Sequence, residues 1–264
     1  MNQKEWIKEH KKLVSEEKRF LKVGQKEKKS FLNDTVERFL PDGIQEKLNL
    51  AFIKGFEVVF SKGIPLVEKT YSRRQKEEDF RVNQFAFDEK ETKSMAGFRQ
   101  SANRSSRKNM LISGAEGAAL GVLGIGLPDI PIFIGMIIKS MQEISLSYGF
   151  SFDSDDEKIF MLKLIRTSLS SGEHLVEENI SVGRLICGFE EPIGTMKEEI
   201  EKTASVLSDR LLYMKFVQGI PIIGMIGGLS DYTVMKEISQ YARLAYKKRF
   251  LRKVWEEQKE KHES

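Results

Sequence analysis

Three acidic residues stand in or beside the most apolar parts of this 264-residue chain, where a carboxylate could do chemistry: Glu116, Asp129 and Asp231. A carboxylate in apolar surroundings has a perturbed pKa, and such groups act as general acids and bases in hydrolases. The two aspartates also precede apolar helical runs, where an acidic side chain accepts hydrogen bonds from first-turn amides. Helix capping therefore explains Asp129 and Asp231 without catalysis, and we assign no catalytic residue.

Other catalytic and ligand-binding patterns are incomplete. His174 lies in a Glu-His-Leu-Val-Glu-Glu stretch, but the second histidine of a metalloprotease helix is missing. The acidic run Asp153 to Glu157 lacks the glycine and the distant glutamate of a calcium loop, and acids before an apolar run favour a helix start. No glycine-rich segment ends in the Lys-Ser/Thr pair of a phosphate-binding loop. We expect no metal and no cofactor, and no small-molecule ligand is identified.

Positive charge is concentrated at the two ends of the chain. The net charge is +4 overall, with ten Lys/Arg against five Asp/Glu in residues 1–30 and eight against four in residues 243–264. Such ends attract nucleic acid or an anionic membrane surface, and the alternative is a pair of solvated helices. The basic clusters lack interleaved aromatic residues and any known recognition motif, so no nucleic-acid partner is expected. Anionic headgroups on the cytoplasmic face fit them better.

Cysteine content and the first residues predict the compartment. Cys187 is the only cysteine, which suits a reducing environment. The first residues lack a continuous apolar segment and a small-residue cleavage site, so no signal peptide is expected. These features predict a cytoplasmic protein, and they leave its oligomeric state open.

Helical periodicity runs through most of the chain, and strand signals are scarce, so the predicted fold is all-α. Residues 1–30 form a basic amphipathic helix, predicted to be mobile, and residues 31–264 form a single helical domain. The helix either binds a membrane or a partner, or packs on its own domain. Its apolar face consists of Trp6, Ile7, His10, Leu13, Val14, Phe20 and Leu21.

Turn and capping signals place the other helices. A turn at Pro41 to Gly43 precedes a helix that ends near Phe60, and the acidic run Asp153 to Glu157 begins another. Gly188 to Pro192 interrupts the chain again before a strong helix from Thr195 to Phe216.

The most apolar run extends from Gly117 to Ile138, and Asp129 is its only ionisable residue. Its 22 residues match a membrane-spanning length, but Pro128 and Pro131 divide it into two shorter segments. A straight crossing would place Asp129 at mid-bilayer, at a cost of about 2.5–3.5 kcal/mol. We therefore predict a hairpin with a helix starting near Ile130, which either dips into a membrane or forms a soluble core.

A second glycine-rich turn resembles the first. The segment GIPIIGMIGGLSDY, residues 219–232, echoes PIFIGMII and precedes a helix predicted from Val234 to about Trp255, with Asp231 as its cap. Ser113, Gly117 and Gly121 recur every fourth residue before the first turn and would let another helix backbone approach closely. We expect the two turns to pack together or to enter the same bilayer.

These motifs resemble those of the EcsC family of bacterial proteins, named for a member encoded beside an ATP-binding-cassette transporter. The first motif, GxxGxxxGxxGxGLPDIPxFI with a later YGF, runs from Gly114 to Phe150 and is followed by DSDDEKIFMLKLI. The second combines IPIIGMIGGLSDY with AxxAYKKRFL, so the resemblance covers residues from about Pro41 to Leu251. It implies an all-helical, membrane-associated protein linked to a transporter operon. It implies no reaction.

The residues expected to make contacts are the small, turn-forming and charged positions of the two motifs. They are Gly117, Gly121, Gly124, Pro128, Asp129, Pro131, Gly135, Tyr148, Gly149, Pro221, Gly224, Asp231 and Arg249. The resulting hypothesis is a helical accessory protein, peripheral to or dipping into the cell membrane. Its partner would be a membrane protein such as a transporter, or an anionic membrane surface. The alternatives are a soluble helical interaction protein and a hydrolase that uses buried carboxylates.

Overall fold

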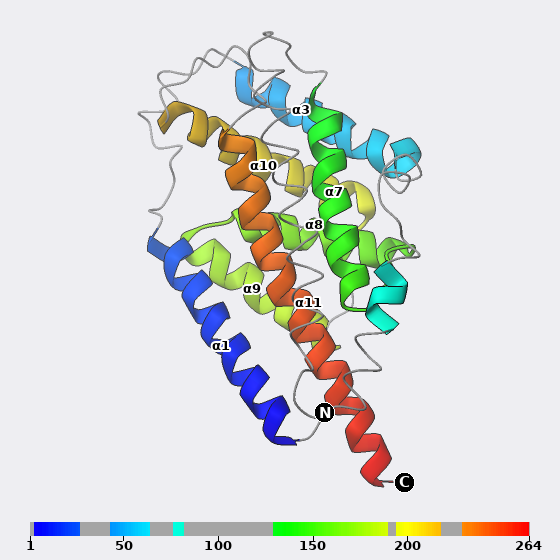
Figure 1. The fold of residues 1–264 in the computed structure, drawn as a ribbon. Coiled ribbons are helices and arrows are strands. Elements are labelled where there is room, and N and C mark those ends of the chain that lie inside the picture. The colour runs from blue at the N-terminus through cyan, green and yellow to red at the C-terminus, as the bar shows by residue number, and fades with distance from the viewer. Residues whose placement is uncertain are drawn as a thin grey trace.

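The computed structural model describes residues 3–26, 43–63, 76–81, 129–189, 194–217 and 229–263, and every regular element within these ranges is helical. The all-α prediction is confirmed. The helices are α1 (Gln3–Lys26), α3 (Ile44–Val58), the π-helical turn η1 (Val59–Gly63), α7 (Asp129–Ser147), α8 (Asp155–Leu169), α9 (Gly172–Ile186), α10 (Met196–Val217) and α11 (Leu229–Glu263) (Figure 1).

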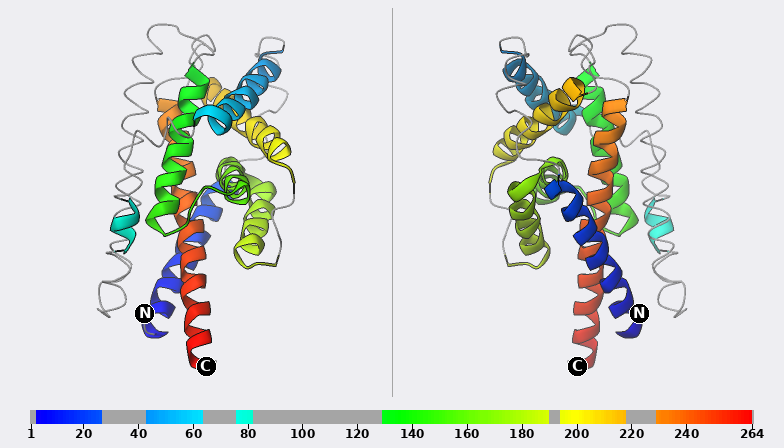
Figure 2. Two further views of the ribbon diagram at one scale, coloured as in Figure 1. Left: turned by 90° about the vertical axis from the view of Figure 1, so that its right-hand side faces the viewer. Right: turned by 90° about the vertical axis from the view of Figure 1, so that its left-hand side faces the viewer.

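The 35-residue helix α11 is the axis of the fold, because it contacts α1, α7, α8, α9 and α10. It is about 52 Å long at 1.5 Å per residue. α7 runs beside it, and α8 and α9 lie to one side of this pair (Figure 2). The first residues of α1 and the last residues of α11 lie at one end of the molecule, while α7 and α11 both begin at the other (Figure 1).

The core is built around α7. Its apolar side chains are buried on more than one side, between α3 and α11. The window Ile130–Ser147 has a mean hydropathy of 1.2 and is 72% buried, and α7 is the one helix of the described ranges long and apolar enough to cross a membrane. A buried core helix satisfies the same length and composition criteria. The completely buried side chains of α7 include Ile130, Phe133, Ile134, Ile137, Ile138, Met141 and Ile144.

A buried arginine joins three of the remaining helices. Arg166 of α8 is 7% exposed, and its Nη1 donates to Glu199 Oε2 of α10 at 2.6 Å. Its Nη2 donates to Glu178 Oε2 of α9 at 3.0 Å. A charge taken out of water is expensive unless it is paired, so these two carboxylates fix where α9 and α10 cross α8.

The capping signals located several helix starts correctly. Gly43, with φ of 70°, directly precedes α3, whose helical path continues through η1 to Gly63. The acidic run does begin a helix, and Ser154 is its N-cap, with Oγ accepting from the Glu157 amide at 3.2 Å. α10 begins at Met196, one residue after the predicted position.

Two details of the predicted helices are wrong. α11 begins at Leu229 rather than Val234, so Asp231 is the third helical residue and not the residue before the helix. An acid in the first turn still interacts favourably with the helix dipole, which is why its sequence signal resembles that of a cap. Asp129, predicted as the cap of a helix starting near Ile130, is instead the first residue of α7, so that cap is wrong by one position.

The basic N-terminal helix packs on the rest of the protein. α1 contacts α9 and α11, and its Leu13 is only 2% exposed. The predicted division at residue 30 falls in the undescribed segment 27–42, so it stays a prediction. Of the two predicted glycine-rich turns, Pro128 and residues 219–228 also lie outside the described residues, whereas residues 129–131 and 229–232 belong to α7 and α11.

Gly55 marks the closest approach of α3 to α7, because a Cβ there would lie 2.5 Å from Ile134 Cδ1 and 3.0 Å from Ile130 Cγ2. We predict that Gly55→Leu lowers the free energy of unfolding by about 1–3 kcal/mol through overpacking. Lys54→Leu, at an exposed position of the same helix, should change it by less than about 0.5 kcal/mol. Urea unfolding followed by circular dichroism tests this, and equal losses in both variants would contradict it.

Candidate functional site

The ends of the two sequence motifs meet against α8. Tyr148 and Phe150 follow α7, and their rings pack on the rings of Phe250 and Tyr246 of α11, with centroids 6.3 and 5.9 Å apart respectively. Segments separated by about a hundred residues in the sequence therefore form one aromatic cluster.

Glu157 of α8 lies at the centre of this cluster. It is 5% exposed, and its Oε1 accepts from Tyr246 Oη while its Oε2 accepts from Arg249 Nη1, both at 2.6 Å. The Arg249 guanidinium lies over the rings of Phe150 and Phe160, 4.4 and 5.1 Å from their centroids. A planar guanidinium can stack on rings and pair with a carboxylate at the same time, which a lysine ammonium cannot do.

The chemistry of this Glu157 cluster is structural. Burial, and then the charge of Glu157, raise the pKa of Tyr246 well above its usual value, so the phenol stays protonated and donates its hydrogen bond. The cluster thus holds α8 against α11, with each oxygen of the Glu157 carboxylate bound to a donor of α11.

The glycine of the Tyr-Gly pair has a geometric reason. Gly149 has φ of 78°, the left-handed region that L side chains rarely adopt, and a Cβ there would overlap the ring of Phe80. The preceding Tyr148 is 2% exposed. The pair ends α7 and lets the helical segment 76–81 approach the chain closely.

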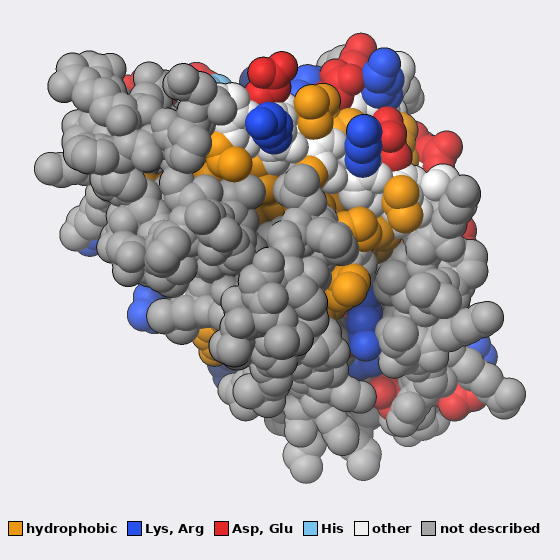
Figure 3. Space-filling model, turned by 90° about the horizontal axis from the view of Figure 1, so that it is seen from above, with side chains coloured by type: hydrophobic (Ala, Val, Ile, Leu, Met, Phe, Trp, Pro, Cys, Tyr) orange, Lys and Arg blue, Asp and Glu red, His pale blue; other side chains and the backbone are white. Residues whose placement is uncertain are grey.

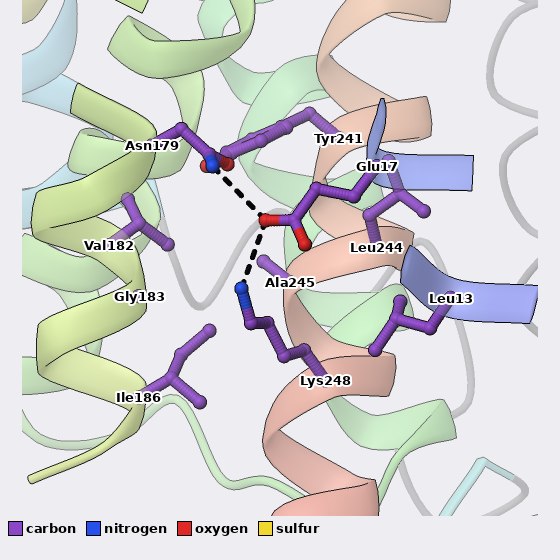
Figure 4. Close-up of a pocket in the computed structure, with 10 residues that line it drawn as sticks. All are labelled: Leu13, Glu17, Asn179, Val182, Gly183, Ile186, Tyr241, Leu244, Ala245 and Lys248. Atoms are coloured by element: carbon purple, nitrogen blue, oxygen red, sulfur yellow. Dashed lines mark hydrogen bonds and ion pairs between the residues drawn. The ribbon is translucent and has the colours of Figure 1, made fainter. Parts of the chain in front are cut away.

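A second polar network joins α1, α9 and α11 (Figure 4). Glu17 Oε1 accepts from Lys248 Nζ at 2.9 Å and from Asn179 Nδ2 at 3.0 Å, and Tyr241 Oη donates to Asn179 Oδ1 at 2.8 Å. The cavity beside these side chains has a volume of about 10 Å³, which is too small for an organic ligand. This network is a junction between helices.

The residue before Lys248 on α11, the buried Lys247, also pairs with carboxylates of α1. Lys247 is 2% exposed, and its Nζ lies 3.2 Å from Glu9 Oε2 and 3.8 Å from Glu16 Oε2. Burial by itself raises the pKa of Glu9, but the hydrogen bond from Lys12 and the charge of Lys247 outweigh it, so the pKa is lowered overall. Glu9 is therefore held in its ionised form.

The basic cluster near the C-terminus is occupied by these internal contacts. Lys247 and Lys248 pair with α1, and Arg249 pairs with α8. Arg252 and Lys253 pair within α11 with Glu256 and Glu257, at 2.6 and 3.9 Å. The cluster that the sequence offers as a lipid-binding element is thus used largely to hold helices together.

A cleft of about 600 Å³ lies between α1 and α11, within the size range of organic-ligand sites. The α8–α9 junction and Arg210 of α10 complete its walls. Apolar and positively charged side chains both line it. The charged ones are Arg19, Arg210, Lys236, Arg243 and Lys247, with Glu16 and Glu237 as the carboxylates.

The structure brings together three of the predicted site residues: Tyr148, Gly149 and Arg249 all belong to or adjoin the Glu157 cluster. Pro131 and Gly135 lie near the opposite end of α7. Asp129 and Asp231 are described only as helical backbone. The others lie outside the described residues: Gly117, Gly121, Gly124, Pro128, Pro221 and Gly224.

Sequence reasoning missed the carboxylates that organise the fold. Glu157 was interpreted only as a first-turn acid, because its partners lie on a helix about ninety residues away. A signal did exist for α1: Glu9 and Glu16 are seven residues apart on one face of a basic helix, which predicts docking on a basic partner.

Comparison with known proteins identifies the family of the chain. The model of the EcsC protein family matches residues 3–251, from the start of α1 to the part of α11 that contacts Glu157. The chain belongs to the EcsC family. The match begins well before Pro41, so it includes the N-terminal helix.

Two relatives come from Bacillus subtilis (strain 168). The uncharacterized protein YdbA is 24% identical over 140 residues, 51% of this chain and 51% of that protein. Protein EcsC is 25% identical over 148 residues, 54% of this chain and 59% of that protein. The matches therefore span only about half the length of these curated relatives. No solved structure matches the chain.

We predict that Glu157→Gln lowers the free energy of unfolding by about 1.5–3 kcal/mol, because Arg249 loses its carboxylate while the hydrogen bond from Tyr246 can persist. Asp156→Asn is the matched control at the exposed neighbouring position and should cost less than about 1 kcal/mol. Urea unfolding measures both, and a Glu157→Gln loss no greater than that of the control would disprove the central role of Glu157.

Glu9 should make stability depend on pH. Its folded pKa is lowered from the ordinary value of about 4.5, so its contribution is fully present above that pH and is lost as the pH falls through the folded pKa. The difference in unfolding free energy between wild type and Glu9→Gln should be largest near neutral pH and shrink below about pH 4.5. A difference that stays constant from neutral to acid pH would rule this out.

Proposed function

We propose that this protein is a helical accessory protein that attaches to the cytoplasmic face of the cell membrane and binds an integral membrane partner there. The attachment surface is the end of the molecule where α7 begins. The kind of partner, an ATP-binding-cassette transporter, follows from the family resemblance alone. No catalysis is part of the proposal.

The observation that carries the proposal is the apolar surface of α3 and α7, two helices in contact. Leu50 and Val58 of α3 are 50% and 48% exposed, and Ile132 of α7 is 50% exposed. Seen from this end, hydrophobic side chains gather between charged ones (Figure 3). Exposed apolar groups that gather on one face are typical of protein or membrane contacts, whereas isolated ones need no explanation.

The sequence before α7 extends this apolar character. Residues 117–128 contain no charged residue and lead directly into α7 at Asp129. α7 itself is mostly buried, so the proposal does not require it to cross the bilayer. Contact through an apolar end fits a protein that sits on or dips into the membrane.

Exposed lysines recur at helical spacing along one stripe of α1: Lys8, Lys11, Lys18 and Lys22. Because α1 begins at the end of the molecule opposite to the start of α7 (Figure 1), this stripe is not part of the proposed contact surface. Attachment through the apolar surface should therefore be retained at high salt, which screens charges but not apolar contacts.

A soluble helical interaction protein is the second candidate, and the 72% burial of the apolar window in α7 favours it. It predicts a protein that never sediments with membranes. A hydrolase built on Glu116, Asp129 and Asp231 depends on side chains outside the described part of the chain and stays a prediction.

Membrane fractionation of the full chain tests the proposal. We expect wild type to stay with the membranes after washes with 1 M salt, a concentration at which charges are screened beyond about 3 Å. Ile132→Asp should move most of the protein to the soluble fraction, since it places a charge on the proposed contact surface.

Ile180→Asp is the matched control, because Ile180 is 51% exposed but lies on α9. It should remain in the membrane fraction, and circular dichroism should show that both variants are folded. Wild type found only in the soluble fraction would reject the proposal and favour the second candidate. Equal release of both variants would reject the α3–α7 surface as the contact.

A further inference from the structure

The cleft between α1 and α11 is long as well as large. Its lining residues on α11 run from Thr233 to Lys247, fourteen residues apart, which corresponds to about 21 Å of helix. An elongated cleft of about 600 Å³ has the dimensions of a site for an extended ligand.

Apolar side chains form the middle of the cleft. Phe20 of α1 and Leu244 of α11 line it and are half-buried, and Val23 of α1 is 57% exposed. Leu169 and Leu175, from the α8–α9 junction, are already 6% and 1% exposed and form its closed floor. A hydrocarbon chain lying here would remove the exposed surface of Phe20, Val23 and Leu244 from water.

The charge of the cleft favours an anion. Five Lys/Arg and two Glu line it, a balance of +3. Arg210 forms a two-point ion pair with Glu237, and Lys247 pairs with Glu9. Arg19 and Lys236, in contrast, have no carboxylate partner among the described residues, and both are exposed to solvent.

Arg19 stands at one end of the cleft and Lys236 at the other. The contacts of Glu17 with Lys248 and of Phe20 with Tyr241 place Arg19 beside residues 241–248 of α11. Lys247 at this end is paired with Glu9 and Glu16, and Lys236 shares its end with the Arg210–Glu237 pair. A guanidinium also suits the planar, two-point recognition of a carboxylate or phosphate.

We propose that this cleft binds a single-chain anionic amphiphile of the fatty-acid or alkyl-phosphate class. The acidic group lies beside Arg19, and the chain extends over Val23 and Leu244 towards Lys236. A nucleotide fits less well, because the ring of Phe20 already packs on Tyr241, with centroids 5.1 Å apart. This inference goes beyond the proposed membrane attachment, which uses α3 and α7.

A displacement assay on the full-length protein tests the site. The probe is dansylaminoundecanoate, a fluorescent fatty acid, and the competitor is laurate below its micelle-forming concentration. We expect laurate to displace the probe, while acetate, which has the charge but no chain, and dodecyltrimethylammonium, which has the chain but the opposite charge, do not.

Variants then assign the site to the cleft. Arg19→Gln should weaken laurate binding about tenfold or more through the lost charge-assisted hydrogen bonds, and Val23→Asp should weaken it by opposing the chain. Lys22→Gln is the matched control: it removes an exposed cation from α1 outside the cleft and should change the affinity less than about twofold.

Several outcomes would overturn the inference. They are a probe that does not bind, displacement by acetate or the cationic amphiphile as effective as by laurate, and equal effects of Arg19→Gln and Lys22→Gln.

Flotation with phosphatidylglycerol vesicles distinguishes a free ligand from a bilayer headgroup. If Arg19→Gln abolishes flotation while laurate never binds, the headgroup is the ligand and the free-amphiphile proposal fails. Ile132→Asp should leave laurate binding unchanged, so failure of membrane attachment is separable from failure of this site.

Discussion

The arrangement of the helices depends on ion pairs that radiate from the middle of α11. Consecutive residues of a helix point about 100° apart, so Lys247, Lys248 and Arg249 point in three different directions. The first two pair with carboxylates of α1 and the third with Glu157 of α8. Because a buried charge is tolerated only when it is paired, each contact excludes arrangements in which its helix is rotated or shifted by a turn.

Apolar burial and charge pairing have different tasks in this fold. The apolar surface of α7, enclosed by α3 and α11, supplies a non-directional driving force that many packings could satisfy. Arg166, Lys247 and Glu157 are nearly inaccessible to water and find their partners in one arrangement only. This pairing also explains why the basic residues Lys247 to Arg249 leave little positive surface, because their charged groups contact carboxylates of neighbouring helices.

Local features were predictable from the sequence, and tertiary ones were not. The all-α class, the start of α8 and the start of α10 follow from periodicity and capping, which act over a few residues. Asp231 was misplaced because first-turn acids and caps give similar signals. The partners of Glu157 and the walls of the cleft come from helices distant in the chain, so only the crossing of those helices reveals them.

The docking of α1 on α11 joins the first helix of the chain to the last. Glu9 and Lys247 are 238 residues apart (247 − 9), so during synthesis α1 leaves the ribosome long before its binding surface exists. Domains are made from the N-terminus at about 5–20 residues per second, which leaves Leu13 and the rest of its apolar face uncovered for many seconds. Throughout that interval the apolar face of α1 is open to chaperones or to lipid, and α1 can dock only after α11 has been synthesised.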